Sequence, residues 1–527
     1  QEDKDLFYNN CVEWECITKR DKKEYIDILK YSKKYCEIDC LVLKGGYEKF
    51  RGQIEKVCDL DIKNYCTSAS LANDFMIKEG VYNGCFKISG VVRAFIQKCV
   101  YGGKVMTRRN EKFSINTNTA DYDCTSEYPS AMAEMEGVLM GSPKLLHKEQ
   151  LNKEFLDSVD GYFVKVLCNN NSTKNLDFPM LSIVDDNGIR QYTNDTQNKF
   201  FYLDKTMVDD AINFIGLDFT YICGYYYNEG RNPQIRKTIR HLFNERLKMK
   251  KVKNPIQSVY KLLMNSAYGK SLLKPIDTDA NVINNDKLEE YIAKHYNFIK
   301  EIVPLNSKVS HVKMIKPINK HYNNCYFGVE VLSMAKRIMS RVMITAEDMK
   351  IPMYYTDTDS IHIDYGGVEK LEAEYEKRFN KVLKGKDLGQ FHIDFDLKGA
   401  ESDTIKSVKS IYLGKKCYLD MLEGYDKKGN KITGEHVRMK GIPNRCLEYY
   451  AGKLYEGSMY DMYKDLLEGQ AIEFDLLCED NAIKFAYEGF NVKSLGYYKK
   501  DSNGKKVMCD YENSNECKSE FMRTIKF

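Results

Sequence analysis

One short segment, residues 351–365 (IPMYYTDTDSIHIDY), constrains the fold more than any other part of the chain. Its apolar residues alternate around a polar centre, which predicts a β-hairpin whose tip carries Asp357 and Asp359. Residues two apart on an extended chain face the same side, so both carboxylates project together. Their repulsion is relieved by a cation, and hard ions such as Mg²⁺ or Mn²⁺ prefer oxygen ligands. The hairpin is therefore a candidate metal site, and a polar surface turn is the alternative.

A second acidic segment, residues 121–132 (DYDCTSEYPSAM), predicts a strand containing Asp123, then a turn, then a helix after Pro129. Asp123 would be the third carboxylate that a pair of bridging metals needs. Ser126 and Tyr128 fall in the turn before the helix, where free backbone N–H groups can hold phosphate oxygens. Ordinary capping of a helix by Asp or Ser is the alternative interpretation.

Residues 235–274 predict two helices separated at Asn254–Pro255, which stops one helix and restarts another. One face of the second helix carries a cation, an amide and an aromatic ring: Lys261, Asn265 and Tyr268. Such a row suits a triphosphate, a sugar and a base. The first helix is basic, and folding it back antiparallel would set Arg246 and Lys250 opposite Lys261. A solvated charged helix face is the alternative.

The composition excludes some classes of protein but does not identify the function of this one. A chain of 527 residues predicts three or four domains, and 43% hydrophobic residues without a long apolar run argue against a disordered or membrane protein. The 80 basic and 76 acidic residues nearly cancel, so any nucleic-acid binding must come from local patches. The 17 cysteines form no C-x-x-C pair, which favours reduced thiols in an intracellular compartment, the cytoplasm or nucleus of an unknown host.

Taken together and in this order, the three segments resemble motifs A, B and C of family B DNA polymerases. DCTSEYP (123–129) is similar to D-x-x-S-L-Y-P, with Glu127 at the position of the usual Leu. KLLMNSAYG (261–269) matches K-x-x-x-N-S-x-Y-G at every fixed position, and YTDTDS (355–360) matches Y-x-D-T-D-S. The resemblance implies template-directed DNA synthesis.

Weaker resemblances lie on either side of these motifs. KCY, with Lys416 and Tyr418, resembles the K-x-Y element that steadies the primer terminus, and VYGG (100–103) resembles Y-x-G-G with its Tyr displaced by one position. The resemblance therefore implies a set of DNA-binding residues: Lys416, Tyr418, Tyr101, Gly102, Gly103 and Lys440. YCEID resembles the third exonuclease motif through Tyr35 and Asp39, but the first two motifs are absent. We therefore expect that Gln1 begins inside an exonuclease domain and that this chain does not proofread.

The spacing of the motifs resembles the protein-primed group found in phages, adenoviruses, virus-like transposons and linear plasmids. The resemblance implies an α+β, multi-domain, right-hand fold: a palm with an antiparallel sheet, helical fingers and a thumb, after a truncated exonuclease remnant. The expected segments are 1–65 (exonuclease remnant), 66–164 (linker and palm with motif A), 165–235 (insertion contacting a terminal protein), 236–274 (fingers with motif B), 275–326 (insertion for strand displacement), 327–420 (palm with motif C and K-x-Y) and 421–527 (thumb).

The resemblance also implies a role for each candidate residue. The expected catalytic and metal ligands are Asp123, Asp357 and Asp359, holding two Mg²⁺ ions, with Mn²⁺ as a substitute. The expected nucleotide-binding residues are Lys261, Asn265, Tyr268, Tyr128, Arg246, Lys250 and Ser126. The expected partners are primer and template DNA, deoxynucleoside triphosphates and a terminal protein as a candidate primer, with a monomeric chain and no membrane.

Two other classes of function stay open at this point. A catalytically silent polymerase-like scaffold would keep the fold and bind DNA without synthesis. Another palm-bearing enzyme, such as a primase or nucleotidyl cyclase, would also use paired Asp residues with Mg²⁺. The full match to motif B favours a DNA polymerase over the other palm-bearing enzymes, and the resemblance to the protein-primed group implies replication of viral or mobile-element linear DNA.

Overall fold

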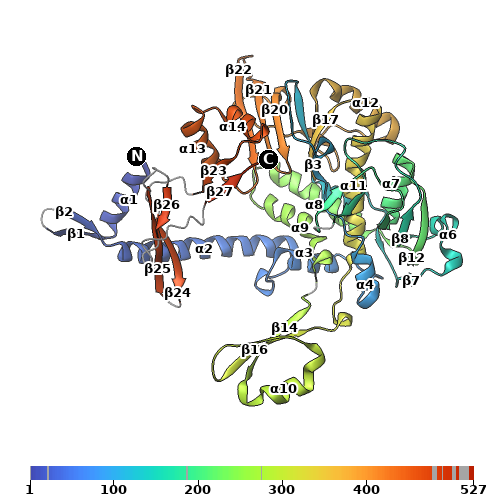
Figure 1. Ribbon diagram of the computed structural model, residues 1–527, viewed down its shortest axis with the longest axis horizontal. Helices are drawn as coiled ribbons and strands as arrows, with labels where there is room; N and C mark the ends of the chain where they lie inside the picture. The colour runs from blue at the N-terminus through green and yellow to red at the C-terminus, as the bar shows by residue number, and fades with distance from the viewer. Residues whose placement is uncertain are drawn as a thin grey trace. The chain divides into compact units, whose positions relative to one another are not determined.

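The computed structural model describes residues 2–20, 23–185, 188–274, 276–476, 483–488, 491–500, 506–509 and 522–527. The chain divides into two compact units (Figure 1). The first unit comprises Gln1–Asn83 and Asn232–Leu273, and the second comprises Gly84–Arg231 and Lys274–Phe527.

The first unit is mainly helical. Its elements are α1 (Glu2–Glu13), the hairpin of β1 (Ile17–Arg20) and β2 (Lys23–Ile26), α2 (Ile28–Cys58), α3 (Ser68–Lys78), α8 (Gln234–Lys251) and α9 (Gln257–Ser266). The side chain of Asp27 caps α2 by accepting the backbone N–H of Lys30 at 3.0 Å. Helices α8 and α9 pack on each other, and α9 packs on α3. The predicted break at Asn254–Pro255 is confirmed.

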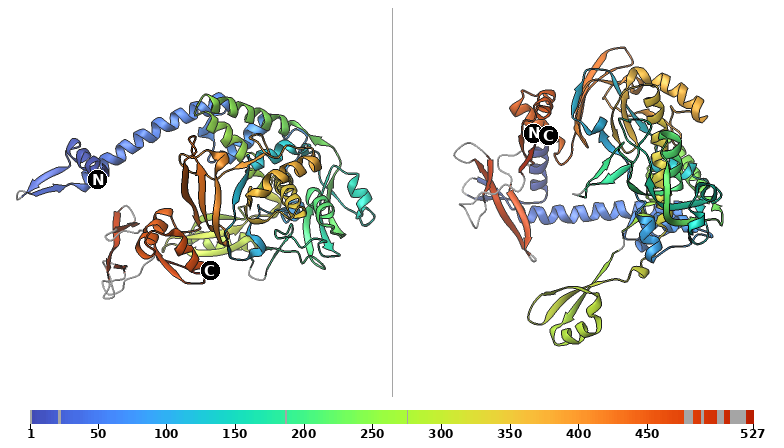
Figure 2. Two further views of the ribbon diagram at one scale, coloured as in Figure 1. Left: turned by 90° about the horizontal axis from the view of Figure 1, so that it is seen from above. Right: turned by 45° about the vertical axis from the view of Figure 1, so that its right-hand side comes forward.

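A nine-stranded antiparallel sheet organises the second unit. Its strands are β3 (Val105–Thr107), β4 (Phe113–Ile115), β5 (Thr119–Cys124), β17 (Met353–Asp357), β18 (Ser360–Asp364), β19 (Phe391–Ile393), β20 (Lys406–Gly414), β21 (Cys417–Tyr425) and β22 (Lys431–Met439). The order is β22-β21-β20-β5-β18-β17-β3, with β19 on β5 and β4 on β20. The long strands β20–β22 run side by side in orange in Figure 2. The predicted hairpin around Asp357 and Asp359 is confirmed as β17–β18.

Helices α5 (Glu127–Glu134), α11 (Cys325–Asp348) and α12 (Val368–Phe379) lie in the same unit as this sheet. The hydroxyl of Tyr122 on β5 donates to Glu372 of α12 at 3.0 Å, so alternation turns the neighbouring Asp121 and Asp123 to the other side of the strand. Helix α5 begins at Glu127, two residues before Pro129, because a proline in the first helical turn breaks no backbone hydrogen bond. Helix α11 is buried around most of its circumference. It packs against α5, α12, α7 (Lys205–Ile215) and α4 (Gly90–Gln97).

The segment expected to be the first insertion, residues 165–235, shares its sheet with residues 144–145 and 161–164, which precede the expected boundary. A four-stranded sheet has the order β11-β8-β12-β7, built from β7 (Lys144–Leu145), β8 (Gly161–Cys168), β11 (Phe200–Asp204) and β12 (Phe219–Tyr227). Helix α7 shares a buried core with this sheet, including Val164, Val166, Met207 and Val208. A short hairpin joins β9 (Ser182–Val184) to β10 (Arg190–Tyr192).

Residues 278–315, inside the segment expected to be the second insertion, form a layer. Three strands have the order β14-β16-β15, from β14 (Thr278–Asn284), β15 (Ile299–Pro304) and β16 (Val309–Ile315), with α10 (Leu288–His295) beside them (Figure 1). Whether either segment is an insertion with the expected role stays a prediction.

The expected boundary between palm and thumb at 420/421 falls inside β21, so β21 and β22 continue the large sheet. Beyond them, α13 (Asn444–Leu454), α14 (Met459–Leu467) and β23 (Ile472–Asp475) share a buried core with β20–β22. Strand β23 pairs with β27 (Met522–Ile525), and β24 (Ile483–Glu488), β25 (Asn491–Lys500) and β26 (Lys506–Cys509) form a separate sheet. The rest of the expected thumb lies outside the described residues.

Two expectations from composition can be checked on the described residues. The fourteen cysteines from Cys11 to Cys446 are free thiols. None of the described helices has both the length and the apolar character needed to cross a bilayer.

Candidate active site

Strand pairing brings the three predicted carboxylates together. In the register of β5 and β18, Asp123 lies opposite Ser360, and the backbone N–H of Cys124 donates to the carbonyl of Asp359 at 2.8 Å. Asp357 lies opposite Ser360 across the β17–β18 hairpin. Two segments more than 200 residues apart in the sequence therefore contribute carboxylates at the ends of neighbouring strands within the sheet.

A tight turn holds the two aspartates of the hairpin. The backbone N–H of Asp359 donates to the carbonyl of Asp357 at 2.8 Å, which closes a three-residue turn around Thr358. Thr358 has φ of 65°, a conformation that a β-branched residue rarely adopts. Such a residue costs about 1–3 kcal/mol and persists only where its surroundings hold it. Here the N–H of Thr358 donates to the carbonyl of Lys104 at 2.8 Å.

The turn opens onto a polar cavity of about 650 Å³, a volume typical of ligand sites. The lining residues come from β5, α5, the β17–β18 hairpin, the segment after β19, β21 and β22: Asp121, Asp123, Tyr128, Asp357, Thr358, Asp359, Ser360, Asp394, Asp396, Lys416, Tyr418, Glu435, His436 and Arg438. Acidic side chains outnumber basic ones in this wall, so the cavity favours a cationic ligand.

The acidic groups raise one another's pKa values. Burial, reinforced by the charges of Asp359, Asp394 and Asp121, raises the pKa of Asp123 to about 8. Burial also raises the pKa of Asp359. The pKa of the Glu127 carboxyl is raised to about 8 by burial and then by Asp359. The raised pKa values mean that the positive charges near these carboxylates do not offset the repulsion between them and the cost of their burial.

Lys416 supplies part of the missing charge. Its Nζ atom lies 2.8 and 2.9 Å from the two carboxylate oxygens of Asp357. The lysine side chain is half exposed, so this ion pair contributes little to stability and can be replaced by another cation.

The donor set of the cavity fits hard divalent ions. Among the residues that the structure describes, no group of three His, Cys, Asp or Glu side chains is arranged to hold a metal by itself. Mg²⁺ at phosphate-transferring sites usually takes one or two carboxylates and completes its shell with water and substrate phosphates. Asp123 and Asp359, with raised pKa values and oxygen donors only, match this kind of incomplete site.

A buried polar cluster supports the floor of the cavity. His362 lies directly opposite Asp121 in the β5–β18 register, and its Nδ1 atom is 3.0 Å from the hydroxyl of Tyr412. Burial lowers the pKa of His362, but the carboxylates of Asp420 and Asp121 outweigh it and the net shift is upward. The hydroxyl of Ser410 donates to Asp420 at 2.7 Å. Hydrogen bonds thus tie β18, β20 and β21 together beneath the acidic residues.

The other predicted residues of the second unit occupy different places. Tyr128 and Lys416 line the cavity with Tyr418, whose ring is buried. Ser126 precedes α5 with φ of 53° and makes no side-chain capping bond there. Lys440 is exposed, and its backbone N–H donates to the carbonyl of Lys416 at 3.0 Å.

The glycine-containing loop before β3 approaches the turn Asp357–Thr358–Asp359. A Cβ atom placed on Gly103 would lie 2.5 Å from Cγ2 of Thr358, whereas one on Gly102 would meet nothing within 4 Å. Tyr101 does not line the acidic cavity; its ring lies under the guanidinium of Arg190, 4.5 Å away. A role of Tyr101 in DNA binding stays a prediction.

The remaining predicted residues belong to the first unit. Lys261 and Asn265 are exposed on α9, and Tyr268 follows the end of that helix. On α8, Lys250 is exposed and Arg246 is half-buried, which lowers the pKa of its guanidinium. Tyr35 and Asp39 are both exposed on α2. The roles assigned to all these residues stay predictions.

Sequence reasoning missed several residues of the cavity wall. Asp394 and Asp396 follow β19, whose residue His392 lies opposite Asp123. Apolar and polar residues alternate in FHIDFD (391–396) as they do in the hairpin of residues 351–365. This alternation was the sequence signal that could have identified Asp394 and Asp396. Glu435, His436 and Arg438 lie on β22, where no local pattern separates them from an ordinary half-exposed strand.

Comparisons with known proteins find relatives described as DNA polymerases. The model of a family described as DNA polymerase type B, organellar and viral, matches residues 2–349. A probable DNA polymerase of Ascobolus immersus is 26% identical over 446 residues, which cover 81% of this chain and 33% of the relative. A probable DNA polymerase of Neurospora intermedia is 27% identical over 458 residues, which cover 84% of this chain and 42% of the relative. The chain thus spans less than half the length of these relatives.

A solved structure of phi29 DNA polymerase complexed with primer–template DNA has a similar fold. It superposes with a TM-score of 0.56 at 14% identity, covering 84% of this chain and 68% of that chain.

Proposed function

Because the chain belongs to the organellar and viral type B DNA polymerases, we propose that it extends DNA primers by adding deoxynucleotides that a DNA template selects. The observation that carries this proposal is the convergence of Asp123 and Asp359 in a 650 Å³ acidic cavity. The lysine of K-x-Y, Lys416, lies at the same cavity.

Asp123 and Asp359 are the proposed ligands of two Mg²⁺ ions, with Asp357 assisting. Bound ions would supply Lewis-acid chemistry, activating the primer 3′-hydroxyl and neutralising the leaving pyrophosphate. The strained turn at Thr358 and the register of β5 with β18 fix the two carboxylates before substrate arrives. Catalysis by the protein itself then consists mainly of positioning and charge stabilisation.

Residues at the cavity wall have proposed roles in holding substrates. Tyr128 would pack under the sugar of the incoming nucleotide and exclude a 2′-hydroxyl, and N–H groups near Ser126 would hold phosphate. Lys416 and Tyr418 would hold the primer terminus, with Lys440, Tyr101, Gly102 and Gly103 as further DNA contacts. Lys416, which pairs with Asp357, would be available to the primer phosphates if Asp357 instead held a metal ion.

The first unit supplies the proposed contacts with the triphosphate and base. Lys261 would bind the phosphates, with Arg246 and Lys250 as second contacts. Asn265 and Tyr268 would form part of the pocket for the new base pair. Exposure of Lys261 and Asn265 on one face of α9 supports this assignment.

We also propose that a hydroxyl of a terminal protein can replace the primer hydroxyl in the same site. The resemblance of motif spelling and spacing to the protein-primed group supports this. Residues 165–235 are the proposed contact with that protein, residues 275–326 are proposed to assist strand displacement, and the chain is proposed to act as a monomer.

Primer extension on a recessed template tests the proposed function. The 527-residue chain should add the nucleotides that the template dictates, only with a divalent ion. Asp359→Asn should lower the rate about a thousandfold, because a catalytic ion contributes several kcal/mol of charge stabilisation. Asp364→Asn, at the opposite end of the same strand, is the matched control and should be nearly neutral. Template-independent addition, or no addition by the unaltered chain, would contradict the proposal.

A further inference from the structure

A buried lysine lies beside the catalytic turn without lining the acidic cavity. The side chain of Lys104 is only 8% exposed. Its Nζ atom donates to the carbonyl of Phe178 at 3.0 Å, lies 3.9 Å from Sδ of Met343 and sits 5.3 Å from the centre of the Tyr192 ring. A buried amino group, charged or neutral, is tolerated only with such hydrogen-bond partners, so the side chain has a defined position.

The backbone of the same residue contacts the catalytic turn. The carbonyl of Lys104 accepts the N–H of Thr358 at 2.8 Å, and the next residue, Val105, pairs with Asp357 across β3 and β17. Because side chain and carbonyl belong to one residue, fixing the ammonium also fixes the acceptor that Thr358 uses. Thr358 needs such support, since its φ of 65° is unfavourable for a β-branched residue.

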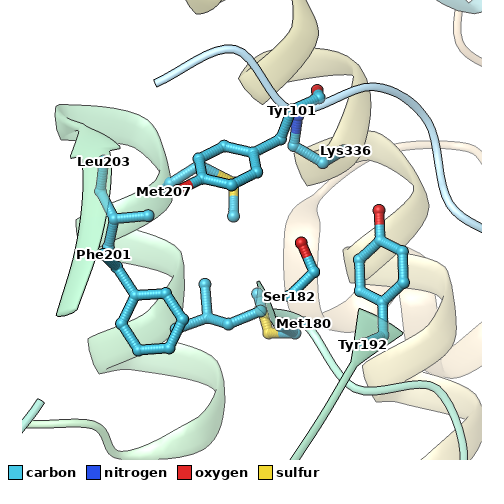
Figure 3. Close-up of a pocket in the computed structure, with 9 residues that line it drawn as sticks. Tyr101, Met180, Ser182, Tyr192, Phe201, Leu203, Met207 and Lys336 are labelled. Atoms are coloured by element: carbon cyan, nitrogen blue, oxygen red, sulfur yellow. Dashed lines mark hydrogen bonds between the residues drawn. The ribbon is translucent and has the colours of Figure 1, made fainter. Parts of the chain in front are cut away.

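A second lysine, which is half-buried, holds the other end of this loop. Nζ of Lys336 on α11 donates to the carbonyl of Tyr101 at 2.7 Å. Figure 3 shows Tyr101 and Lys336 at one side of a small cavity whose opposite wall is formed by Met180, Ser182 and Tyr192. The cavity measures only about 10 Å³, room for no more than about one water molecule. The loop thus has little freedom to move against residues 180–182 and Tyr192.

We propose that Lys104 is a positioning residue, which couples the described parts of the segment 176–192 (residues 176–185 and 188–192) to the turn Asp357–Thr358–Asp359. The anchors on the segment are the carbonyl of Phe178 and the ring of Tyr192. The segment contributes no residue to the lining of the acidic cavity, yet through Lys104 it holds the carboxylates of that cavity in place. The kinetic part of this inference rests on the proposed function, whereas its structural part does not.

Amide hydrogen exchange of the 527-residue chain tests the structural part. Lys104→Met keeps the length and apolar packing of the side chain but removes the ammonium. Exchange of the Thr358 amide should become about tenfold faster, because its acceptor is no longer anchored. The exchange rates of backbone amides in the paired strands β8 and β12 should change by less than about twofold. The matched control is Lys98→Met, since Lys98 also lies over a tyrosine ring, at 5.0 Å from Tyr202, but is exposed.

Kinetics of nucleotide addition form the second arm. Lys104→Met should lower kcat about tenfold with KM for nucleotide nearly unchanged, because displaced carboxylates impair the chemical step more than substrate binding. The Mg²⁺ concentration for half-maximal rate should rise, since Mg²⁺ demands near-ideal geometry. Lys98→Met should change none of these values.

Two results would overturn the inference. One is an unchanged exchange rate of the Thr358 amide in Lys104→Met. The other is faster exchange spread evenly over the second unit, which indicates general destabilisation. If Lys104→Met does not fold, Tyr192→Leu removes the ring beneath the ammonium and should accelerate exchange at Thr358 in the same local way; no acceleration there would also overturn it. Failure of the unaltered chain to extend primers would count against the proposed function alone.

Discussion

Gly103 lies so close to Thr358 that a Cβ atom at Gly103 would be 2.5 Å from Cγ2 of the threonine. Real Cβ atoms do not approach other atoms so closely, so any side chain at this position must push the turn away. The backbone φ of Gly103 is not in the left-handed region, so the backbone conformation does not require glycine. Glycine is required because a larger residue would collide with Thr358. The loop and the catalytic turn are thus packed in direct contact.

Gly103→Ala should displace Thr358 and with it the carboxylates on either side. Misplacement by about 1 Å can cost about a hundredfold in rate, so we expect kcat to fall between about tenfold and a hundredfold. Single-nucleotide incorporation under saturating substrate measures this. Gly102→Ala is the control, since a Cβ there meets nothing within 4 Å. Equal effects of the two substitutions would show that the close approach is unimportant.

Tyr128 lines the acidic cavity next to Asp123. Tyr128→Val should lower the preference for deoxynucleotides over ribonucleotides by about tenfold or more, because a removed ring leaves space for the 2′-hydroxyl. The ratio of kcat/KM values for the two nucleotide types measures the preference. Tyr128→Phe keeps the ring and should keep the preference. Unchanged discrimination in the valine variant would exclude Tyr128 as the contact with the sugar.

Local alternation and turn chemistry were enough to predict the elements that carry the carboxylates. The β17–β18 hairpin, the strand with Asp123 and the break between α8 and α9 all follow from patterns within about fifteen residues. The positions of Asp394 and Arg438 at the cavity could not be predicted in this way. Asp394 reaches the cavity because β19 pairs with the distant strand β5, and the alternation in FHIDFD indicates a strand but not its partner. Arg438 reaches it because β22 forms a hairpin with β21, which joins the large sheet through β20 and β5.

Lys416 pairs with Asp357 in the DNA-free chain and is the proposed contact with the primer strand. Lys416→Gln should weaken primer–template binding and reduce the slope of log K against log salt by about one, because one phosphate contact is lost. Fluorescence anisotropy at several salt concentrations gives this slope. Lys415→Gln, exposed in the same turn, should leave the slope nearly unchanged. An unchanged slope in the Lys416 variant would argue against a phosphate contact.

Lys104 also predicts a pH dependence of stability. Burial, and then the charge of Lys336, lowers the pKa of Lys104 to about 7, whereas a solvated lysine titrates near about 10.4. Between these values the unfolded chain holds a proton that the folded chain has lost. The free energy of unfolding therefore rises with pH, by at most about 1.4 kcal/mol per pH unit. Below about pH 7 both states are protonated and the contribution is constant.

The comparison of the unaltered chain with Lys104→Met isolates this contribution. The difference in their thermal midpoints should shift in favour of the unaltered chain as pH rises from about 7 to about 9. A difference that stays flat or shifts the other way would show that the ammonium keeps an ordinary pKa in the folded protein.

The central claim is that Asp123 and Asp359 together bind divalent ions, and Mn²⁺ binding tests it most directly. Electron paramagnetic resonance of free Mn²⁺ counts the ions bound by the chain with primer–template and an incoming nucleotide, using a primer without a 3′-hydroxyl. We predict about two ions for the unaltered chain. Asp123→Asn and Asp359→Asn should each lose at least one ion or weaken it about a hundredfold, whereas Asp364→Asn should not. Two ions bound with unchanged affinity in both active-site variants would contradict the account.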